Sequence, residues 1–318
     1  MTILVIVESP AKCKKIENYL GNGYKCIASF GHIRQLGDRK DGLKCIDIKN
    51  NYKPNFKLLP EKSKYIKKLI DNIKKASEII LATDDDREGE AIAWHICKVF
   101  NLPISTTKRI IFHEITKSAI QNAVNNYTYL DMNKVHAQQS RQILDKLVGY
   151  TLTPLLWKHI SRNSKTSLSA GRCQTPALRL VYELQKEINK SPGRKVYETE
   201  GEFTDFNITF KLNKSYESED NIVEFLEESV NHEHIFNLTK PKNVEKKPPL
   251  PFTTSTLQQN SSNNLHYSPK QTMRLAQTLY EAGHITYMRT DSKTYSAEFI
   301  KKTSAYIKKL YDETYVSK

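Results

Sequence analysis

The chain has 318 residues, enough for two or three domains that each bury a core. Its formal net charge of +14 favours a polyanionic partner, although charge alone does not separate nucleic acid from a membrane. The five cysteines are scattered without a Cys-x-x-Cys pair, which argues against a zinc module and a disulfide framework. No run reaches transmembrane length and the start does not read as a signal peptide, so we expect a soluble, cytoplasmic protein.

The first part of the chain predicts an α/β domain. Ile3–Val7 is a continuous apolar run, typical of a strand buried on both faces, and residues 11–20 predict a helix. A second buried strand is predicted at residues 78–83, followed by an acidic loop and a helix at 91–99. Because open α/β sheets bind ligands at the carboxyl ends of their parallel strands, we expect the acidic loop to lie at a ligand site.

That loop is dense in carboxylates. By alternation along the chain, Asp84, Asp86 and Glu88 can converge while Asp85 points away, and Glu8 follows the other strand. The negative charges of these carboxylates repel one another unless a hard cation lies among them, and ligands that are all oxygen suit Mg²⁺. The alternative is a solvated acidic start to the next helix, stabilised by the helix dipole. The additional carboxylate at Glu8 favours the metal site.

A stretch near the end of the sequence carries a candidate nucleophile. A helical pattern runs to Gly283, which suits the turn that ends a helix, and residues 284–288 are predicted to be extended. In a strand, Tyr287 and Arg289 lie on one face. A phenol attacks poorly until cations stabilise its phenolate, and a guanidinium neutralises phosphate oxygens, so the pair suits attack on a phosphodiester. Most of the 17 tyrosines pack or lie on surfaces, which leaves a structural role open.

These motifs together resemble the type IA DNA topoisomerases. Tyr-Met-Arg-Thr-Asp-Ser, at residues 287–292, is similar to their active-site signature. Glu8, Asp84 and Asp86 meet the pattern of the Toprim domain, which topoisomerases share with DnaG-type primases and some nucleases. Further similar motifs lie at 8–12, 31–34, 87–93, 112–116, 138–150 and 169–174.

The resemblance implies roles for the residues around the tyrosine. Tyr287 would form a 5′-phosphotyrosine link with single-stranded DNA, while Arg289 and Lys12 stabilise the phosphate. Glu8 would also transfer a proton to the leaving 3′ oxygen. The Mg²⁺ ligands implied are Glu8, Asp84 and Asp86, supported by Arg87 and Glu88. His113 stands where the family usually has asparagine, and we expect it to support the site structurally.

A polar helix and the loop after it are expected to hold the DNA. Residues 131–148 have a helical pattern with one polar face, and Trp157 can stack on a base, with core packing as its alternative. The small residues at 167–176 allow close approach of a phosphate to a helix start, after a short insertion at 161–166. By resemblance, the DNA contacts are His32, Arg141, Gln142, Asp145, Tyr150, Trp157, Ser169, Ala170, Gly171, Arg172, Cys173, Gln174 and Arg289.

The expected fold is therefore multidomain. Alternating residues at 196–203 and 206–212 predict paired strands, and the three prolines within 242–251 predict a linker. The domains expected are a Toprim α/β domain with a parallel sheet and flanking helices (1–130, with a polar insertion at 35–64), a helical DNA-groove domain (131–190), a β arch segment (191–251) and the start of a helical active-site domain (252–318). Family members continue well beyond this point, so we expect a fragment, a split protein or a truncated gene product.

The function expected by resemblance is relaxation of negatively supercoiled DNA by transient single-strand cleavage, strand passage and Mg²⁺-dependent religation. No Gly-rich nucleotide loop is present, consistent with a reaction without ATP, and no zinc is expected in this chain. The partner expected is single-stranded or underwound DNA, bound by a monomer that a missing C-terminal portion completes. Two alternatives remain: a Toprim nuclease or primase that does not need Tyr287, and a non-catalytic DNA-binding remnant.

Overall fold

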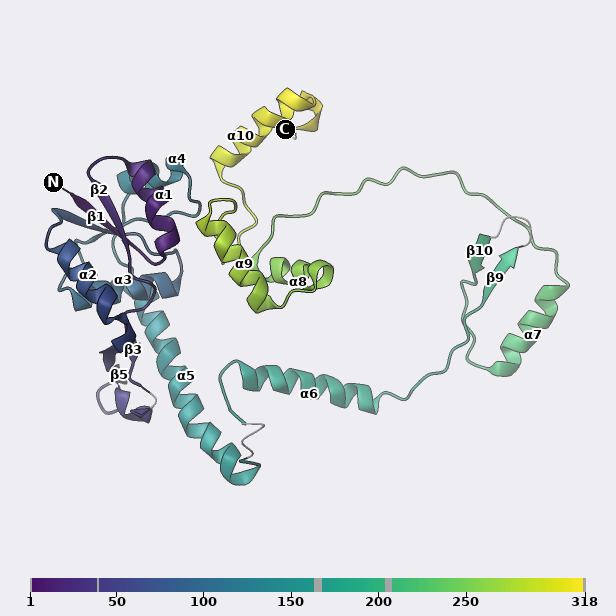
Figure 1. Cartoon of the computed structure of the whole chain (residues 1–318). Coiled ribbons are helices and arrows are strands. Elements are labelled where there is room, and N and C mark those ends of the chain that lie inside the picture. The colour runs from purple at the N-terminus through teal and green to yellow at the C-terminus, as the bar shows by residue number, and fades with distance from the viewer. Residues whose placement is uncertain (1, 39, 163–167, 204–207, 317–318) are drawn as a thin grey trace. The chain divides into compact units, whose positions relative to one another are not determined.

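The computed structural model describes residues 2–38, 40–162, 168–203 and 208–316 (Figure 1). It divides into two compact units: Met1–Arg172 together with Pro249–Lys318, and Cys173–Pro248. The first unit holds the candidate site, and each unit is described by itself. The domain boundaries expected from the sequence remain a prediction.

A four-stranded parallel sheet lies at the centre of the first unit, which confirms the predicted α/β fold (Figure 1). In spatial order its strands are β2 (Tyr24–Ala28), β1 (Ile3–Val7), β7 (Glu78–Leu81) and β8 (Lys108–Arg109). The helices beside it are α1 (Pro10–Leu20), α2 (Ser63–Ile73), α3 (Arg87–Val99) and α4 (Lys117–Asn125).

The apolar run of β1 is buried on both faces of this sheet. Val5 and Val7 point into one core, where Ile16 of α1 and Ile120 of α4 also pack. The alternate residues Leu4 and Ile6 point into a second core, formed with α2 and α3. Because every residue of Leu4–Val7 is buried, the strand needs apolar side chains throughout rather than at alternate positions.

The polar insertion forms two small antiparallel ladders outside the main sheet. One pairs β3 (Arg34–Leu36) with β6 (Phe56–Leu58), and the other pairs β4 (Ile46–Asp47) with β5 (Lys53–Pro54). A short 3₁₀ helix, η1 (Gly42–Cys45), lies between β3 and β4, and a second, η2 (Pro60–Lys62), lies between β6 and α2. A small core within the insertion packs on Trp94 of α3 and on helix α5 (Met132–His159), so the insertion is fixed to the unit.

Helix α5 (Met132–His159) is longer than the helix predicted at 131–148. Asp131 caps its start by accepting from the backbone N–H groups of Asn133 and Lys134. Neither Gly149 nor Pro154 ends the helix. A single glycine costs only about 1 kcal/mol, and Pro154 removes one backbone hydrogen bond near the helix end, where contacts with the insertion and the following loop hold the helix in place.

The C-terminal part of the first unit consists of helices. They are α8 (Thr254–Leu265), α9 (Pro269–Glu281), α10 (Ala297–Leu310) and the 3₁₀ helix η3 (Glu313–Tyr315). Gly283 follows α9 with φ +72°, as predicted for a helix end. The prediction of a strand at residues 284–288 is wrong, because this segment has no ladder partner and bends. Its attachment to the sheet domain includes one backbone bond, from Tyr287 N to His113 O at 2.7 Å.

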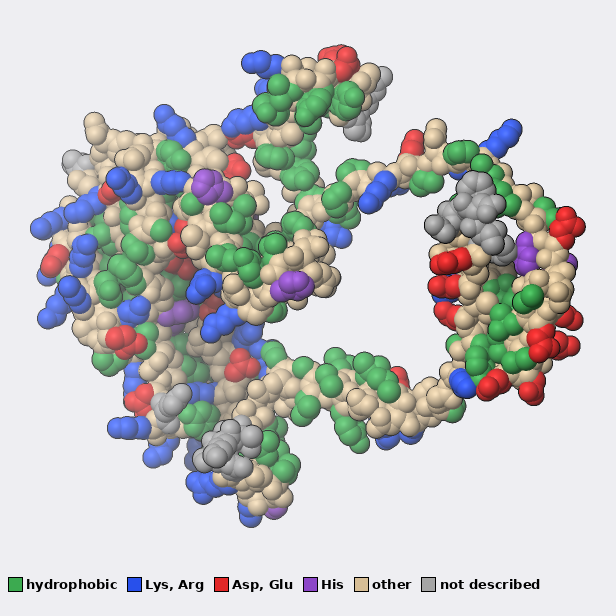
Figure 2. All heavy atoms as spheres, turned by 45° about the vertical axis from the view of Figure 1, so that its right-hand side comes forward, with side chains coloured by type: hydrophobic (Ala, Val, Ile, Leu, Met, Phe, Trp, Pro, Cys, Tyr) green, Lys and Arg blue, Asp and Glu red, His purple; other side chains and the backbone are tan. Residues whose placement is uncertain are grey.

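The second unit contains α6 (Gln174–Lys190), the antiparallel pair β9 (Glu200–Phe203) and β10 (Ile208–Lys211), and α7 (Glu219–Val230). The predicted strand pair is thus present but shorter, and Phe206 lies outside the described residues. In Figure 2, Asp and Glu side chains gather on this unit, whereas Lys and Arg spread over the sheet domain. None of the helices within the described ranges is long and apolar enough to cross a bilayer.

The close approach of α3 to the chain that follows β7 can be tested by a substitution at Gly89. A Cβ atom at this position would lie 2.1 Å from the carbonyl oxygen of Asp84, which is backbone and cannot move aside. We expect Gly89→Ala to destabilise the first unit by about 3 kcal/mol or more, measured as the midpoint of urea unfolding. Gly149→Ala is the control, because its nearest neighbour is 3.9 Å away and alanine favours the helix. Equal midpoints for the two variants would contradict this packing.

Candidate active site

Two neighbouring strand ends bring the first charged groups together. Glu8 follows β1, and its Oε1 accepts the backbone N–H of Asp84, after β7, at 2.9 Å. Lys12, in the first turns of α1, is fully buried and forms an ion pair with the Asp84 carboxylate. The parallel pairing of β1 with β7 therefore places the carboxyl groups of Glu8 and Asp84 and the ammonium group of Lys12 at one edge of the sheet.

Glu8 is poised to hold a proton near neutral pH. Burial raises the pKa of its carboxyl to about 7, and repulsion from Asp84 adds to this effect, while Lys12 opposes it. A group with a pKa close to the working pH can both give and receive a proton efficiently. Among the site's carboxyl groups that show a pKa shift, Glu8 is thus the one suited to acid catalysis.

Asp86 is the point where the tyrosine segment meets the sheet domain. As the N-cap of α3, its Oδ1 accepts the backbone N–H of Gly89 at 2.8 Å. Its Oδ2 accepts the Tyr287 hydroxyl at 2.5 Å and Arg289 Nη1 at 2.9 Å. Burial alone would raise the pKa of Asp86, but these hydrogen bonds and the Arg289 charge bring it below its usual value. Asp86 is therefore an ionised acceptor.

Tyr287 rests as a phenol, not as a phenolate. It is 5% exposed, and its ring packs edge-on against Tyr280 with centroids 5.1 Å apart. Burial, followed by the hydrogen bond to Asp86, raises the pKa of Tyr287 above its usual value. Arg289 pairs with Asp86, and its charge lowers the pKa of Tyr287 only in part, so the phenol stays protonated.

Glu88 makes its hydrogen bonds to residues outside the carboxylate group, and its convergence with Asp84 and Asp86 remains a prediction. Helix α3 begins at Arg87 rather than after the loop, so Glu88 lies in the first helical turn. There it contacts His32 Nε2 at 3.1 Å and Gln138 Nε2 at 3.0 Å. Arg87 itself is exposed at the start of the helix.

The carboxylates have the chemistry that a magnesium ion needs. Glu8, Asp84 and Asp86 offer hard oxygen donors, and within the described residues Glu8 Oε2 and Asp84 Oδ2 accept no hydrogen bond. A cation there would relieve the repulsion that raises the pKa of Glu8. The described ranges contain no ready cluster of three ligands, because Lys12 occupies Asp84, and Tyr287 and Arg289 occupy Asp86. The carboxylates of Glu8, Asp84 and Asp86 therefore fit Mg²⁺ once Lys12 releases Asp84 and once Tyr287 and Arg289 release Asp86.

A buried ion pair below the site was missed by the sequence analysis. Arg109, at the end of β8, is fully buried and donates to Glu90 Oε2 at 2.8 Å. Its other nitrogens donate to the carbonyl oxygens of Thr83 and Asp84 at 3.0 and 3.1 Å. Glu90 in turn accepts the backbone N–H of Asp131 at 2.7 Å, at the start of α5. The pair thus fixes the backbone that carries Asp84.

Further contacts shape the surroundings of the site. Asp85 points away from Glu8 and pairs with Lys134 Nζ at 3.0 Å, as alternation predicted. The His113 side chain is exposed and its Nε2 lies 3.7 Å from Asp85 Oδ2, while its backbone carbonyl holds Tyr287. Lys15 Nζ donates to the carbonyl of Ala282, which ties α1 to the end of α9.

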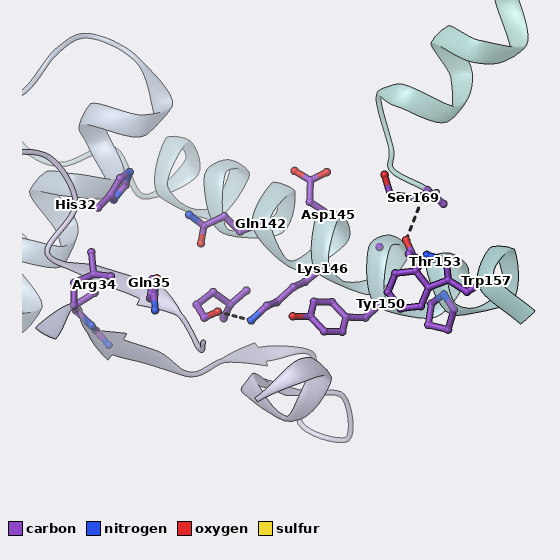
Figure 3. A pocket seen from close by; sticks show the side chains of 15 residues that line it. His32, Arg34, Gln35, Gln142, Asp145, Lys146, Tyr150, Thr153, Trp157 and Ser169 are labelled. Atoms are coloured by element: carbon purple, nitrogen blue, oxygen red, sulfur yellow. Dashed lines mark hydrogen bonds between the residues drawn. The ribbon is translucent and has the colours of Figure 1, made fainter. Parts of the chain in front are cut away.

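Several expected DNA contacts line one pocket of about 900 Å³ beside α5 (Figure 3). His32 and Arg34 form one wall, and side chains of α5 form the other. His32 Nδ1 and Gln142 Oε1 are buried without a hydrogen-bond partner in the described chain, so the wall holds polar groups that a ligand can satisfy. The expected contacts that line the pocket are His32, Gln142, Asp145, Tyr150, Trp157, Ser169 and Ala170.

The loop after α5 is held to the helix by specific bonds. Trp157 is exposed rather than packed in the core, and its Nε1 donates to Leu168 O at 2.7 Å. Asp145 pairs with Arg172 Nε at 2.9 Å and lies 3.9 Å from Arg141 Nε. Of the remaining expected contacts, Gly171 lies in the loop, and Cys173 and Gln174 begin the second unit; Ser167 falls outside the described residues.

Comparison with known proteins agrees with this fold. Residues 3–115 match the family model for the Toprim domain, and residues 129–318 match the model for DNA topoisomerase. A crystal structure of full-length topoisomerase I from Thermotoga maritima is 40% identical over 99% of this chain, with a TM-score of 0.82. The match covers 54% of that protein, so this chain spans about half its length.

The chain belongs to the type IA DNA topoisomerase family and carries a Toprim domain in its N-terminal part. Toprim domains in general bind Mg²⁺, in agreement with the donor set of Glu8, Asp84 and Asp86.

Replacing Arg109 tests whether the buried pair supports the site. Arg109→Met leaves Glu90 buried without its partner and frees two carbonyl groups, so we expect a loss of about 3–5 kcal/mol in the free energy of urea unfolding. Lys108→Met at the next position breaks a solvent-exposed pair with Glu78 and serves as the control, which should change little. Similar free energies of unfolding for the two variants would show that the buried pair of Arg109 with Glu90 does not stabilise the protein.

Proposed function

We propose that this chain cleaves single-stranded DNA through a 5′-phosphotyrosine intermediate and religates it with Mg²⁺, as the cleavage site of an ATP-independent enzyme that relaxes negatively supercoiled DNA. The observation that carries this proposal is the convergence of the Tyr287 hydroxyl and the Arg289 guanidinium on Asp86. Glu8, Lys12 and Asp84 lie at the same sheet edge. The proposed nucleophile is therefore Tyr287. The cations near it are Arg289 and Lys12, and the proposed proton carriers are Asp86 and Glu8.

In the proposed cleavage step, Tyr287 Oη attacks the phosphorus and transfers its proton to Asp86 Oδ2, to which it is already hydrogen-bonded. A new P–O bond to tyrosine forms as the bond to the 3′ oxygen breaks. Glu8, protonated in part at neutral pH, gives a proton to the leaving 3′ oxygen. Arg289 and Lys12 offset the charge on the phosphate oxygens. One phosphodiester is exchanged for another, so no nucleotide cofactor is required.

Religation reverses these transfers. Glu8, now ionised, accepts the proton of the 3′-hydroxyl as that oxygen attacks the phosphotyrosine, and Asp86 returns a proton to Tyr287. The residues that would hold Mg²⁺ are Glu8, Asp84 and Asp86. When bound there, the ion would supply positive charge to the phosphate oxygens. Between cleavage and religation, the covalent link conserves the bond energy.

The strand itself would lie in the pocket beside α5. Exposed Tyr150 and Trp157 offer rings for bases, while His32, Gln142 and the loop residues offer polar contacts. A nuclease with the same carboxylates would not need a tyrosine hydroxyl on Asp86, and that contact favours the phosphotyrosine reaction over the nuclease alternative. DNA is therefore the proposed partner and substrate.

The nucleophile is tested with oligonucleotides labelled at the 3′ end, because a 5′-phosphotyrosine retains the 3′ fragment. We expect the wild-type chain, stopped with detergent, to give a labelled protein adduct that Tyr287→Phe does not form. Phenylalanine keeps the ring packing on Tyr280, so the fold is preserved. Tyr295→Phe, at an exposed tyrosine of the same segment, should form the adduct normally. An adduct on Tyr287→Phe would refute the assignment.

The metal site is tested by titrating Mg²⁺ in the religation of a preformed adduct. Asp84→Asn removes a negative ligand, and we expect the Mg²⁺ concentration for half-maximal religation to rise by about tenfold or more. Asp85→Asn is the matched control, because Asp85 faces Lys134 rather than Glu8. If chelation of Mg²⁺ leaves wild-type religation unchanged, or if both variants need equally more metal, the proposed ligand set is wrong.

A further inference from the structure

An exposed aromatic pair beside the pocket has no part in the proposed reaction. Phe30 follows β2, is 38% exposed, and packs against Tyr65 of α2 with ring centroids 4.0 Å apart and planes tilted by 31°. Its backbone has φ +60°, a left-handed conformation that bulky residues rarely adopt. The pair therefore combines an exposed ring surface with a strained backbone.

Phe30 follows a strand that ends at the carboxylate edge of the sheet and precedes a residue of the pocket wall along the chain. Strand β2 runs parallel to β1, with Ala28 opposite Val7, so Phe30 emerges at the same sheet edge as Glu8. The bond from Ser29 N to Val7 O, at 2.8 Å, extends this pairing to the residue before Phe30. His32, two residues further, lines the pocket. A single strand bound in the pocket and continuing past His32 to the sheet edge would reach these rings.

A lysine completes the arrangement. Lys62 Nζ donates to the carbonyl oxygen of Phe30 at 2.7 Å and lies 5.8 Å from the centre of the Tyr65 ring. The bond holds the strained residue in place, and the charge lies at the border of the ring pair. Rings that take the face of a base, next to a cation that takes a phosphate, are the elements with which proteins bind single-stranded nucleic acid.

Packing alone does not account for the strain at Phe30. Glycine or asparagine adopts this backbone conformation more readily, and 38% of Phe30 stays exposed to solvent although its ring packs on Tyr65. Strained residues persist where the surrounding structure fixes them, and they cluster at ligand sites. A ring held outward at a cost in stability indicates a ligand for that ring.

We propose that Phe30 and Tyr65 form a stacking subsite for one nucleobase of the single strand whose neighbouring nucleotides lie in the pocket beside α5, with Lys62 near its phosphate. The subsite extends the DNA path past His32 along the sheet edge. It rests on the proposed function, since it presumes that single-stranded DNA lies in that pocket.

The test compares two equivalent substitutions. Phe30→Asn removes the ring and suits the left-handed backbone, so the melting temperature should not fall. Tyr52→Asn is the matched control, because Tyr52 is also exposed, at 49%, and also has φ +56°, but lies in the turn between β4 and β5, outside the pocket lining. The measurement is the Kd for a fluorescent oligo(dT) at fixed salt, with the slope of log Kd against log salt.

For Phe30→Asn we expect Kd to rise about 5- to 150-fold, the range for losing one stacked base, with an unchanged salt slope because no charge is removed. Tyr52→Asn should bind as the wild type does. Unchanged binding by Phe30→Asn, equal losses in both variants, or a lower melting temperature of Phe30→Asn without weaker binding would each overturn the proposal. A wild-type chain that neither binds oligo(dT) nor forms the 3′-labelled adduct would instead refute the proposed function itself.

Discussion

The site depends on a single carboxylate, that of Asp86, which accepts hydrogen bonds from three groups. Asp86 caps α3 through Gly89, accepts the Tyr287 hydroxyl and pairs with Arg289. The sheet domain and the tyrosine segment lie 201 positions apart in sequence at this contact. Since a charged hydrogen bond contributes more than a neutral one, Asp86 both positions the nucleophile and holds the segment on the domain.

Charge balance around Asp86 explains why the site can stay assembled without DNA. Lys12 offsets Asp84, Arg289 offsets Asp86, and Glu8 avoids a further negative charge by keeping a proton over part of the neutral range. A phosphate that enters the site would compete for both cations, and a magnesium ion would compete for the carboxylates. In the proposed reaction, substrate and metal would therefore replace the resting contacts, and their binding would release Tyr287 from Asp86.

Much of the sheet domain could be predicted because its signals are local. The apolar run of β1, the helix after Pro10 and the turn at Gly283 follow from residue type alone. Predictions failed where a distant contact decides the outcome. Residues 284–288 look like a strand but have no neighbouring strand to pair with, and Glu88 enters α3 because Asp86 caps it. Arg109 carried no signal, because an arginine's burial depends on where Glu90 lies in space.

The most direct test of the shared carboxylate is a double-mutant cycle of Tyr287→Phe and Asp86→Asn, followed by the free energy of urea unfolding in the absence of DNA and metal. If Tyr287 donates to an ionised Asp86, the effects of the two changes are not additive, and we expect a coupling energy of about 1.5–3 kcal/mol. Additive effects, with a coupling energy near zero, would contradict the account, because the tyrosine and the carboxylate would then not be bonded in the resting protein.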